Sequence, residues 1–140
     1  MKCLSDKKVL RYLNMAKKAS EYSNYKRFHL GAIAVYKGIV LAKGYNSYKT
    51  SPLQKEYNKI KNYDIEGCKS TLHAESCCLG KIKNLDIDFS KVTVFVYREH
   101  KDKTLALARP CISCRKLISD LGIHNVYYTT ENGWAYERVY

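Results

Sequence analysis

The sequence lacks long hydrophobic runs, which argues against a membrane-spanning protein. None of its apolar stretches approaches the roughly 20 residues that a transmembrane helix needs, so we expect no membrane association. The first residues, MKCLSDKKVLRYL, are charged where a secretory signal has its apolar core. We therefore expect an intracellular protein, in the simplest case a cytoplasmic one. The chain also lacks repeats, low-complexity tracts and linkers, so its 140 residues predict one domain, 1–140.

Acidic residues are scarce. Asp and Glu number 13 against 25 Lys and Arg, which gives a net charge of +12 and a pI near 9.4. Such a charge attracts phosphate-bearing partners and speeds their encounter. However, 19 of the basic residues are lysines and the chain is rich in Tyr, Asn and Ile, a mixture that an AT-rich genome produces without selection for nucleic-acid binding. The charge favours a phosphate-bearing partner but locates no site.

The six cysteines do not have the pattern of a disulfide framework. Cys111 and Cys114 form a CxxC pair, whereas Cys77 and Cys78 are adjacent within a predicted helix. Free cysteine is commonly buried, so we interpret the adjacent pair as part of the core.

Helical and strand patterns alternate along the chain. The predicted elements are a helix over 6–22 capped by Ser5, a hairpin of strands 30–36 and 39–45 joined through Lys37-Gly38, a helix over 71–83, a strand over 91–99, a helix over 111–122 ending at Gly122, and a last hairpin around Asn132-Gly133. Residues 46–69 are polar and predict a long loop, and TLALA (104–108) is expected to return extended. Interleaved helices and strands predict an α/β sandwich with helices packed on one sheet.

Two short motifs begin the second and third predicted helices. HAE covers residues 73–75, and CISC covers 111–114. Zinc binds Cys sulfur and His nitrogen, and a catalytic zinc keeps one coordination position for water. Cys111 and Cys114 are one helical turn apart and can face one point, where the helix N-terminus helps to keep the thiols ionised. With His73 as third ligand and Glu75 placed to reach the water, the pattern predicts a hydrolytic zinc site.

The motifs carry a resemblance to a known family. HAE with PCISC is the H-x-E…P-C-x-x-C signature of zinc nucleobase deaminases, and the sequence resembles the cytidine and deoxycytidylate deaminase superfamily over nearly its whole length. The resemblance implies a cytidine-deaminase-like α/β/α sandwich with one mixed sheet of about five strands and a C-terminal antiparallel hairpin. It also implies Zn²⁺ on His73, Cys111 and Cys114, and Glu75 as the catalytic residue that carries protons to the base and the leaving amine.

Further residues are expected to contact the substrate. The stretch LGAIAVYKGIVLAKGYN is similar to the family's first hairpin, which ends in an asparagine that contacts the sugar, here Asn46. The resemblance also implies that the backbone N–H groups near Ala74 and Cys111 face the base carbonyl.

The rim of the expected pocket is less well defined by the sequence. In SNYKRFH (23–29), Arg27, Phe28 and His29 can hold a phosphate and a base, although a solvated loop is an equal alternative. Tyr127 and Tyr128 lie where the family has a substrate-facing loop. Strand alternation turns one of them to the core, and the other, which we expect to be Tyr128, can stack on a base if it is exposed.

The chain departs from the family pattern in two places. The separation between His73 and Cys111 is lengthened by REHKDKTLALA (98–108). The ending, VYYTTENGWAYERVY, looks like an antiparallel hairpin, as in the free-cytidine and toxin-like branches, whereas deoxycytidylate and tRNA adenosine deaminases usually continue into another helix and a parallel final strand. This ending argues against tRNA adenosine deamination.

Three functions remain open from the sequence. The favoured one is cytosine deamination within single-stranded nucleic acid, because of the charge and the aromatic and basic loops. Deamination of a free pyrimidine nucleotide or nucleoside is the alternative. The third is a non-catalytic zinc module that binds nucleic acid, whose metal would need a fourth protein ligand. The candidates for that ligand, none with recognisable spacing to the trio, are Cys68, His29, His100 and His124. An oligomer is compatible with all three.

Overall fold

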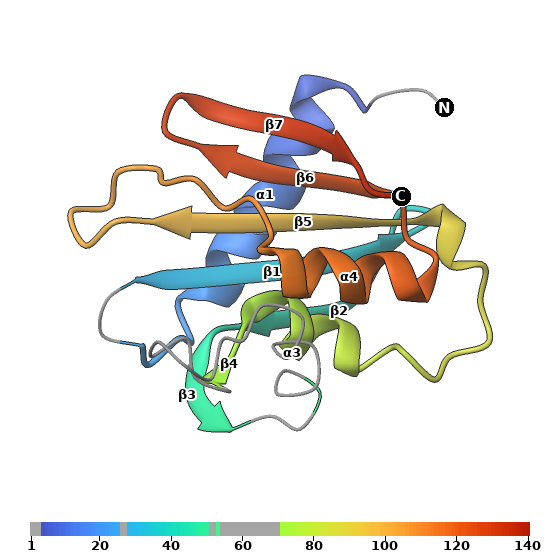
Figure 1. Ribbon diagram of the computed structural model, residues 1–140. Coiled ribbons are helices and arrows are strands. Elements are labelled where there is room, and N and C mark those ends of the chain that lie inside the picture. Colours follow the sequence, from blue (N-terminus) through green and yellow to red (C-terminus); the bar gives the residue numbers. More distant parts are fainter. Residues whose placement is uncertain (1–3, 26–27, 51–52, 54–70) are drawn as a thin grey trace.

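A five-stranded sheet with helices on both faces forms the centre of the computed structural model (Figure 1). The structure describes residues 4–25, 28–50, 53 and 71–140. The order of strands in the sheet is β2-β1-β5-β6-β7. Their bounds are His29–Tyr36 for β1, Ile39–Tyr45 for β2, Val92–Glu99 for β5, Asn125–Thr130 for β6 and Gly133–Arg138 for β7.

The sheet is mixed because a single pair of its strands is parallel. β5 and β6 run parallel, with Val94 opposite Val126, while the other neighbouring strands are antiparallel. A tight turn joins β1 to β2, with positive φ at Lys37 and Gly38 (50° and 82°), as a two-residue hairpin requires. The parallel pair needs a long crossover connection, and that connection carries the second half of the predicted zinc motif.

Helix α1, Asp6–Ser20, covers one face of the sheet. It begins at Ser5, whose side chain accepts a hydrogen bond from the Lys8 backbone N–H, as the sequence predicts for an N-cap. A Cβ at Gly31 of β1 would collide with the backbone carbonyl of Ala16 in α1. The helix therefore lies directly on the strand.

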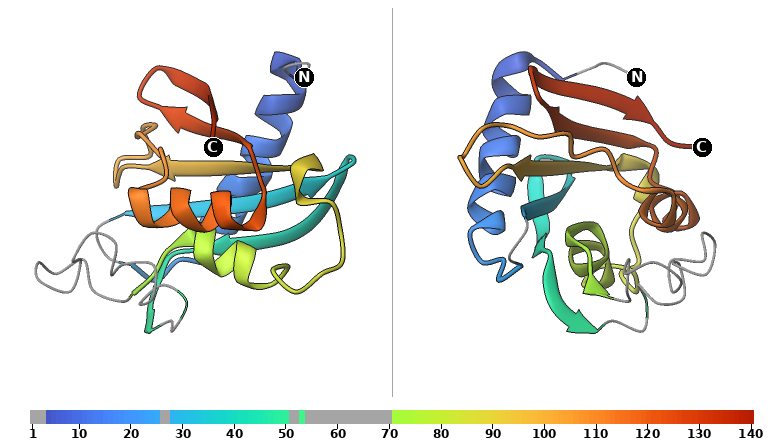
Figure 2. Two further views of the ribbon diagram at one scale, coloured as in Figure 1. Left: turned by 45° about the vertical axis from the view of Figure 1, so that its right-hand side comes forward. Right: turned by 60° about the vertical axis from the view of Figure 1, so that its left-hand side comes forward.

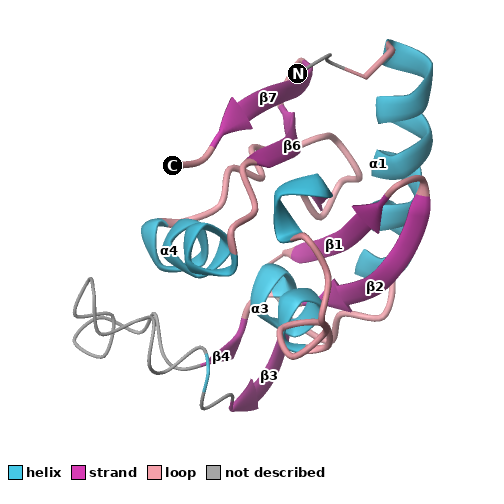
Figure 3. Ribbon diagram, turned by 90° about the vertical axis from the view of Figure 1, so that its right-hand side faces the viewer, coloured by secondary structure: helices cyan, strands magenta, loops and turns pink. Residues whose placement is uncertain are grey.

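Helices α3, Ala74–Gly80, and α4, Ile112–Leu121, cover the opposite face (Figure 2). α4 ends at Gly122, which has the left-handed φ of 90° that favours glycine after a helix. A short strand, β4 (Thr71–Leu72), precedes α3 and pairs with β3 (Ser47–Thr50) beside it (Figure 3). A 3-10 turn over Phe89–Lys91 leads into β5.

Strand alternation divides the core into two clusters. In β5, Val92, Val94 and Val96 pack toward α3 and α4, while Phe95 and Tyr97 pack toward α1. Both faces of the sheet are thus covered, as an α/β/α sandwich requires, and this confirms the predicted fold class and its antiparallel C-terminal hairpin.

Three details differ from the prediction. The second helix spans residues 74–80 rather than 71–83. Its start is later because residues 71–72 pair with β3 instead. The polar segment 46–69 is not loop throughout, since Ser47–Thr50 form β3, and most of the remainder lies outside the described residues. The stretch 104–108 makes a single strand bridge, between Leu105 and Glu99.

Within the described part of the chain, no helix combines the length and the apolar character that crossing a bilayer requires.

Candidate active site

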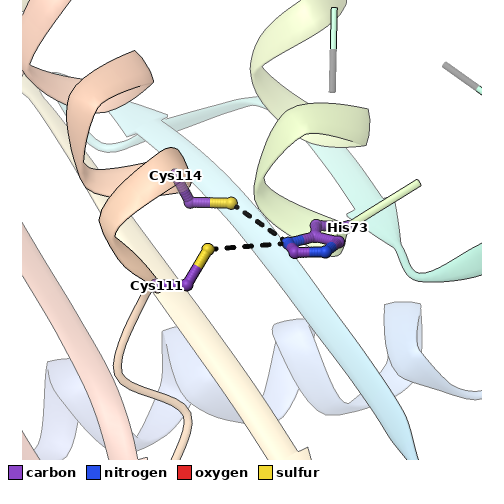
Figure 4. Close-up of side chains that lie close together, drawn as sticks. All are labelled: His73, Cys111 and Cys114. Carbon is purple, nitrogen blue, oxygen red and sulfur yellow. Dashed lines mark hydrogen bonds between the residues drawn. The ribbon is translucent and has the colours of Figure 1, made fainter. Parts of the chain in front are cut away.

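The start of α3 directs the His73 side chain away from its own helix. His73 is the N-cap residue in an extended conformation (φ −83°, ψ 155°), and its side chain makes no capping hydrogen bond. Its carbonyl oxygen accepts the Cys77 backbone N–H at 2.9 Å, which begins the helical hydrogen bonding. The imidazole is left pointing toward the start of α4 (Figure 4).

Helix α4 begins in the same way as α3, with a metal-donor residue at its N-cap. Cys111 is the N-cap in an extended conformation, its side chain makes no capping bond, and its carbonyl accepts the Arg115 backbone N–H at 2.8 Å. Cys114 lies in the first turn of the helix. The spacing of three residues therefore turns both sulfur atoms toward His73 (Figure 4).

The distances within the trio suit one tetrahedral metal ion. The Nδ1 atom of His73 lies 3.8 Å from the Cys111 sulfur and 3.4 Å from the Cys114 sulfur, and the three donor atoms all lie within 4.8 Å of one another. Zinc–sulfur bonds of about 2.3 Å and zinc–nitrogen bonds of about 2.0 Å imply sulfur–nitrogen separations of about 3.6 Å around a tetrahedral ion. The observed separations are close to that value. Among the described residues, the cluster contains these three donors and no fourth.

The electrostatics of the trio favour a thiolate. The pKa of Cys111 is lowered, chiefly by a hydrogen bond from Cys114 and also by one from His73, although burial opposes the shift. By contrast, burial raises the pKa of Cys78, which keeps that thiol protonated and inert. The interpretation of the adjacent cysteines as core residues is confirmed for Cys78, which is fully buried, and wrong for Cys77, which is half-buried.

Glu75 is buried next to the trio. It lies in the first turn of α3 and is only 4% exposed. Burial raises its pKa to about 7, although the nearby His73 lowers it in part. A carboxyl group with a pKa near neutrality can both take up and release a proton, which is the property required of a general acid–base catalyst.

Close packing against β2 fixes α3. A Cβ at Gly44 would collide with the backbone of Ala74 and Cys78, so only glycine allows this approach. The Cys78 thiol lies 3.5 Å from the Ala42 carbonyl oxygen and adds a weak hydrogen bond to the same strand. The positions of His73 and Glu75 thus depend on β2 as well as on their own helix.

A comparison with protein-family models identifies the family. Residues 6–130 match the model described as the cytidine and deoxycytidylate deaminase zinc-binding region. The chain belongs to this family. It is therefore a deaminase of the cytidine and deoxycytidylate type, and the metal that its His/Cys/Cys trio is able to hold is zinc.

Solved structures share the fold of this family member. The dCMP deaminase of cyanophage S-TIM5, in complex with dCMP and dUMP, is 24% identical with a TM-score of 0.63, over 91% of this chain and 85% of that one. Cytidine deaminase from Burkholderia pseudomallei is 17% identical with a TM-score of 0.64, over 97% and 94%. Cytidine deaminase from Mycobacterium tuberculosis is 17% identical with a TM-score of 0.56, over 97% and 92%. A search of curated protein sequences finds no match.

Asn46 is the residue expected to contact the sugar, but in this deaminase-family chain most of its side-chain hydrogen bonds go to other parts of the protein. Its Oδ1 atom accepts hydrogen bonds from the Ser23 hydroxyl at 2.7 Å and the Leu30 backbone N–H at 2.9 Å, and its Nδ2 atom donates to the Phe28 carbonyl at 3.1 Å. An amide has two donor hydrogens, so a single N–H remains for a substrate. Asn46 also lies close to the trio, because its neighbour Ser47 pairs with Leu72, which precedes His73.

The remaining predicted contacts have different outcomes. The Phe28 ring is tilted against that of Tyr25, with ring centroids 5.0 Å apart, and His29 is half-buried at the start of β1. Ala74, whose N–H is expected to face the base, is fully buried in the first turn of α3. Arg27 lies outside the described residues.

The expectation of an exposed tyrosine in β6 is wrong. Tyr127 is fully buried against α1, and Tyr128 is only 8% exposed on the opposite face. Alternation does place the two rings on opposite faces, but both faces are covered by helices. Tyr128 therefore presents no open ring surface for base stacking.

Two arginine groups near the site were not anticipated from the sequence. Arg109 makes a bidentate pair with Glu137, at 2.7 and 3.2 Å, and Arg115 reaches the same carboxylate at 3.8 Å. Arg98 lies at the end of β5, in line with the buried valines of that strand. A charged residue that continues an alternating line of valines is a signal that the sequence contains, at residues 92, 94, 96 and 98.

Proposed function

We propose that this chain converts cytosine to uracil by hydrolysis, with His73, Cys111 and Cys114 as the zinc ligands and Glu75 as the proton carrier. The observation that carries the proposal is the cluster of three metal donors, with no fourth among the described residues, beside a buried carboxyl group whose pKa is raised to about 7. A structural zinc site would be closed by four protein ligands, whereas a catalytic one keeps a position for water.

The roles follow from the chemistry of each group. Zinc, when bound, lowers the pKa of its water ligand and so supplies a nucleophile at neutral pH. Glu75 would take a proton from the attacking water and deliver it to N3 of the base. It would then take the proton of the hydroxyl group added at C4 and deliver it to the departing amine, so that cytosine and water become uracil and ammonia. We assign the backbone N–H of Ala74 to the base carbonyl and the remaining N–H of Asn46 to the sugar.

The substrate that we favour is a free cytosine nucleotide of the dCMP class. The family is described by cytidine and deoxycytidylate, and a solved structure with the same fold holds dCMP and dUMP. The polymer substrate favoured by the sequence becomes the second candidate, because the ring of Tyr128 is buried. One observation still favours it: Tyr25 and Tyr48 are stacked at 4.7 Å, and Tyr48 is 47% exposed, which is the arrangement of a base-stacking platform.

A parallel assay tests the proposal. Conversion to uracil is measured for dCMP, for deoxycytidine and for a cytosine-containing single strand, each over a salt series. We expect conversion of dCMP, with little dependence on salt because few counterions are released. Conversion of the strand beside no conversion of dCMP would favour the second candidate. A zinc-loaded chain that converts none of the three would refute the deaminase proposal.

A further inference from the structure

Arg98 lies on the face of the sheet that carries the candidate active site. Alternate residues of β5 point to α3 and α4, and Arg98 follows Val92, Val94 and Val96 in that series. It is paired across the sheet with Leu30 of β1. The next residue, Glu99, is on the opposite face, where it is bonded to Tyr97 and Lys103.

The Arg98 guanidinium is buried in part without an anionic partner. Its carbon lies 4.4 Å from the centre of the Phe28 ring, and Nη1 donates to the Leu107 carbonyl at 3.4 Å. The Nε atom is buried and has no hydrogen-bond partner among the described residues. Burial lowers the pKa of Arg98, as expected for a guanidinium that has lost water without gaining a carboxylate.

The two other arginines near the site share one carboxylate. Arg109 and Arg115 both pair with Glu137, whereas Arg98 has no ion pair with any described residue. A buried, unpaired N–H of a charged group costs free energy until an acceptor arrives. The Nε atom of Arg115 is likewise buried without a hydrogen-bond partner in the described part of the chain, but the Arg115 guanidinium reaches Glu137. Arg98 is therefore the one of these three arginines that has no carboxylate partner among the described residues.

The contacts of Arg98 also connect it to both halves of the site. The guanidinium lies over the Phe28 ring, and the Phe28 carbonyl accepts a hydrogen bond from the Asn46 amide. Asn46 is followed by β3, which pairs with β4, the strand immediately before His73. Leu107, its other contact, lies four residues before Cys111 in the same segment of chain. The guanidinium thus lies between Phe28, whose carbonyl bonds the Asn46 amide, and the segment that leads to Cys111.

We propose that Arg98 binds the phosphate of the cytosine nucleotide substrate, with Phe28 holding the guanidinium in place. This inference rests on the proposed function, because it assumes that the base is bound at the trio and the sugar near Asn46. The planar guanidinium fits phosphate oxygens with two parallel hydrogen bonds. The phosphate of a free 5′-nucleotide and a phosphodiester of a strand share this chemistry.

The kinetic test compares substrates that differ in phosphate alone. Arg98→Gln and Arg98→Lys are assayed on dCMP, deoxycytidine and a cytosine-containing single strand. We expect Arg98→Gln to lower kcat/KM for dCMP by about 10- to 100-fold, mainly through KM, and to leave deoxycytidine within about 2-fold, because one charge-assisted contact is lost. Arg98→Lys should recover part of the loss.

A loss confined to dCMP identifies the free nucleotide as the source of the phosphate, and a loss confined to the strand identifies a phosphodiester.

Arg11→Gln is the matched control. Its guanidinium also lies over an aromatic ring, 4.9 Å from the centre of Tyr12, but it belongs to α1 on the other side of the sheet. This variant should not change the ratio of dCMP to deoxycytidine activity.

A binding measurement separates failure of this inference from failure of the proposed function. In the wild type, dUMP should raise Tm more than deoxyuridine does, and Arg98→Gln should remove the difference. Equal losses on dCMP and deoxycytidine, or an unchanged dUMP effect in the variant, would overturn the role of Arg98. A wild type that deaminates no substrate refutes the proposed function instead, and the comparison of dUMP with deoxyuridine still decides whether Arg98 binds phosphate.

Discussion

The two faces of the sheet are built from different side chains, although they share the same strands. On the α1 face, Phe95 stacks on Tyr127 with ring centroids 5.2 Å apart, and Tyr12 lies 4.9 Å from Phe95. On the face of α3 and α4, the alternate positions of β5 hold valines. Large rings fill the first interface, whereas smaller side chains let two helix starts come close to the sheet and to each other.

This difference separates stability from chemistry. The aromatic face contains no metal donor cluster among the residues described, and its packing serves to hold α1. The opposite face carries the trio, Glu75 and Arg98. Substitutions on the first face should therefore change the free energy of unfolding, and those on the second should change zinc content or rate.

The largest expected effect belongs to Glu75→Gln. Because Glu75 is not one of the three metal donors, zinc content and Tm should stay near those of the wild type. The rate of deamination should fall by about 10³-fold or more, since no group remains to carry the proton. Metal analysis and steady-state kinetics on the same preparation provide the test. A variant with near-normal turnover would favour the non-catalytic zinc module.

The double substitution Cys111→Ser, Cys114→Ser should abolish zinc binding. We expect about one zinc per chain in the wild type and almost none in the variant, together with a lower Tm, because metal binding and folding are coupled. Metal analysis and thermal unfolding measure both. Cys77→Ser is the control: Cys77 is half-buried outside the trio, and zinc content should be unchanged. Full zinc content in the double variant would contradict the assigned ligands.

A matched pair of glycine substitutions compares the two faces directly. Gly31→Ala would press on α1, and Gly44→Ala would press on α3, because each new Cβ meets helix backbone. Both should lower the free energy of unfolding, by about 1 to 3 kcal/mol. Only Gly44→Ala should also weaken zinc binding and slow the folded enzyme. Equal effects of the two variants on kcat would show that the faces are not independent.

The smallest expected effect concerns Glu137 at the edge of the site. The hydrogen bond from Arg109 holds the pKa of Glu137 below its ordinary value of 4.5. A lowered folded-state pKa contributes stability above pH 4.5, and this stability is lost as the pH falls through the folded-state value. Glu137→Gln should lower Tm by roughly 1–3 °C at pH 7, and the two melting curves should converge once the pH falls below the folded-state pKa of Glu137. A difference that persists there would indicate a packing effect instead.

Local signals predicted the helix ends that depend on local chemistry. Ser5 caps α1 through its own side chain, and Gly122 ends α4 because its positive φ suits glycine. The start of α3 was predicted three residues too early, since residues 71–72 pair with a strand more than 20 positions away in sequence. Such pairing leaves no trace in helical periodicity. The burial of Tyr128 was missed for a similar reason, because a helix from elsewhere covers its face.

Residue chemistry alone predicted zinc and a hydrolytic site, because imidazole, two thiols and a carboxyl group in these two motifs have few other uses together, and the resemblance to a family added deamination. Tertiary structure decided that the motifs meet. His73 and Cys111 are 38 residues apart in sequence, yet their donor atoms lie 3.8 Å apart, because two helices begin side by side on one face of a mixed sheet. It also decided the state of Arg98. Whether a guanidinium finds a carboxylate or remains unpaired depends on every element packed around it, and no local pattern contains that information.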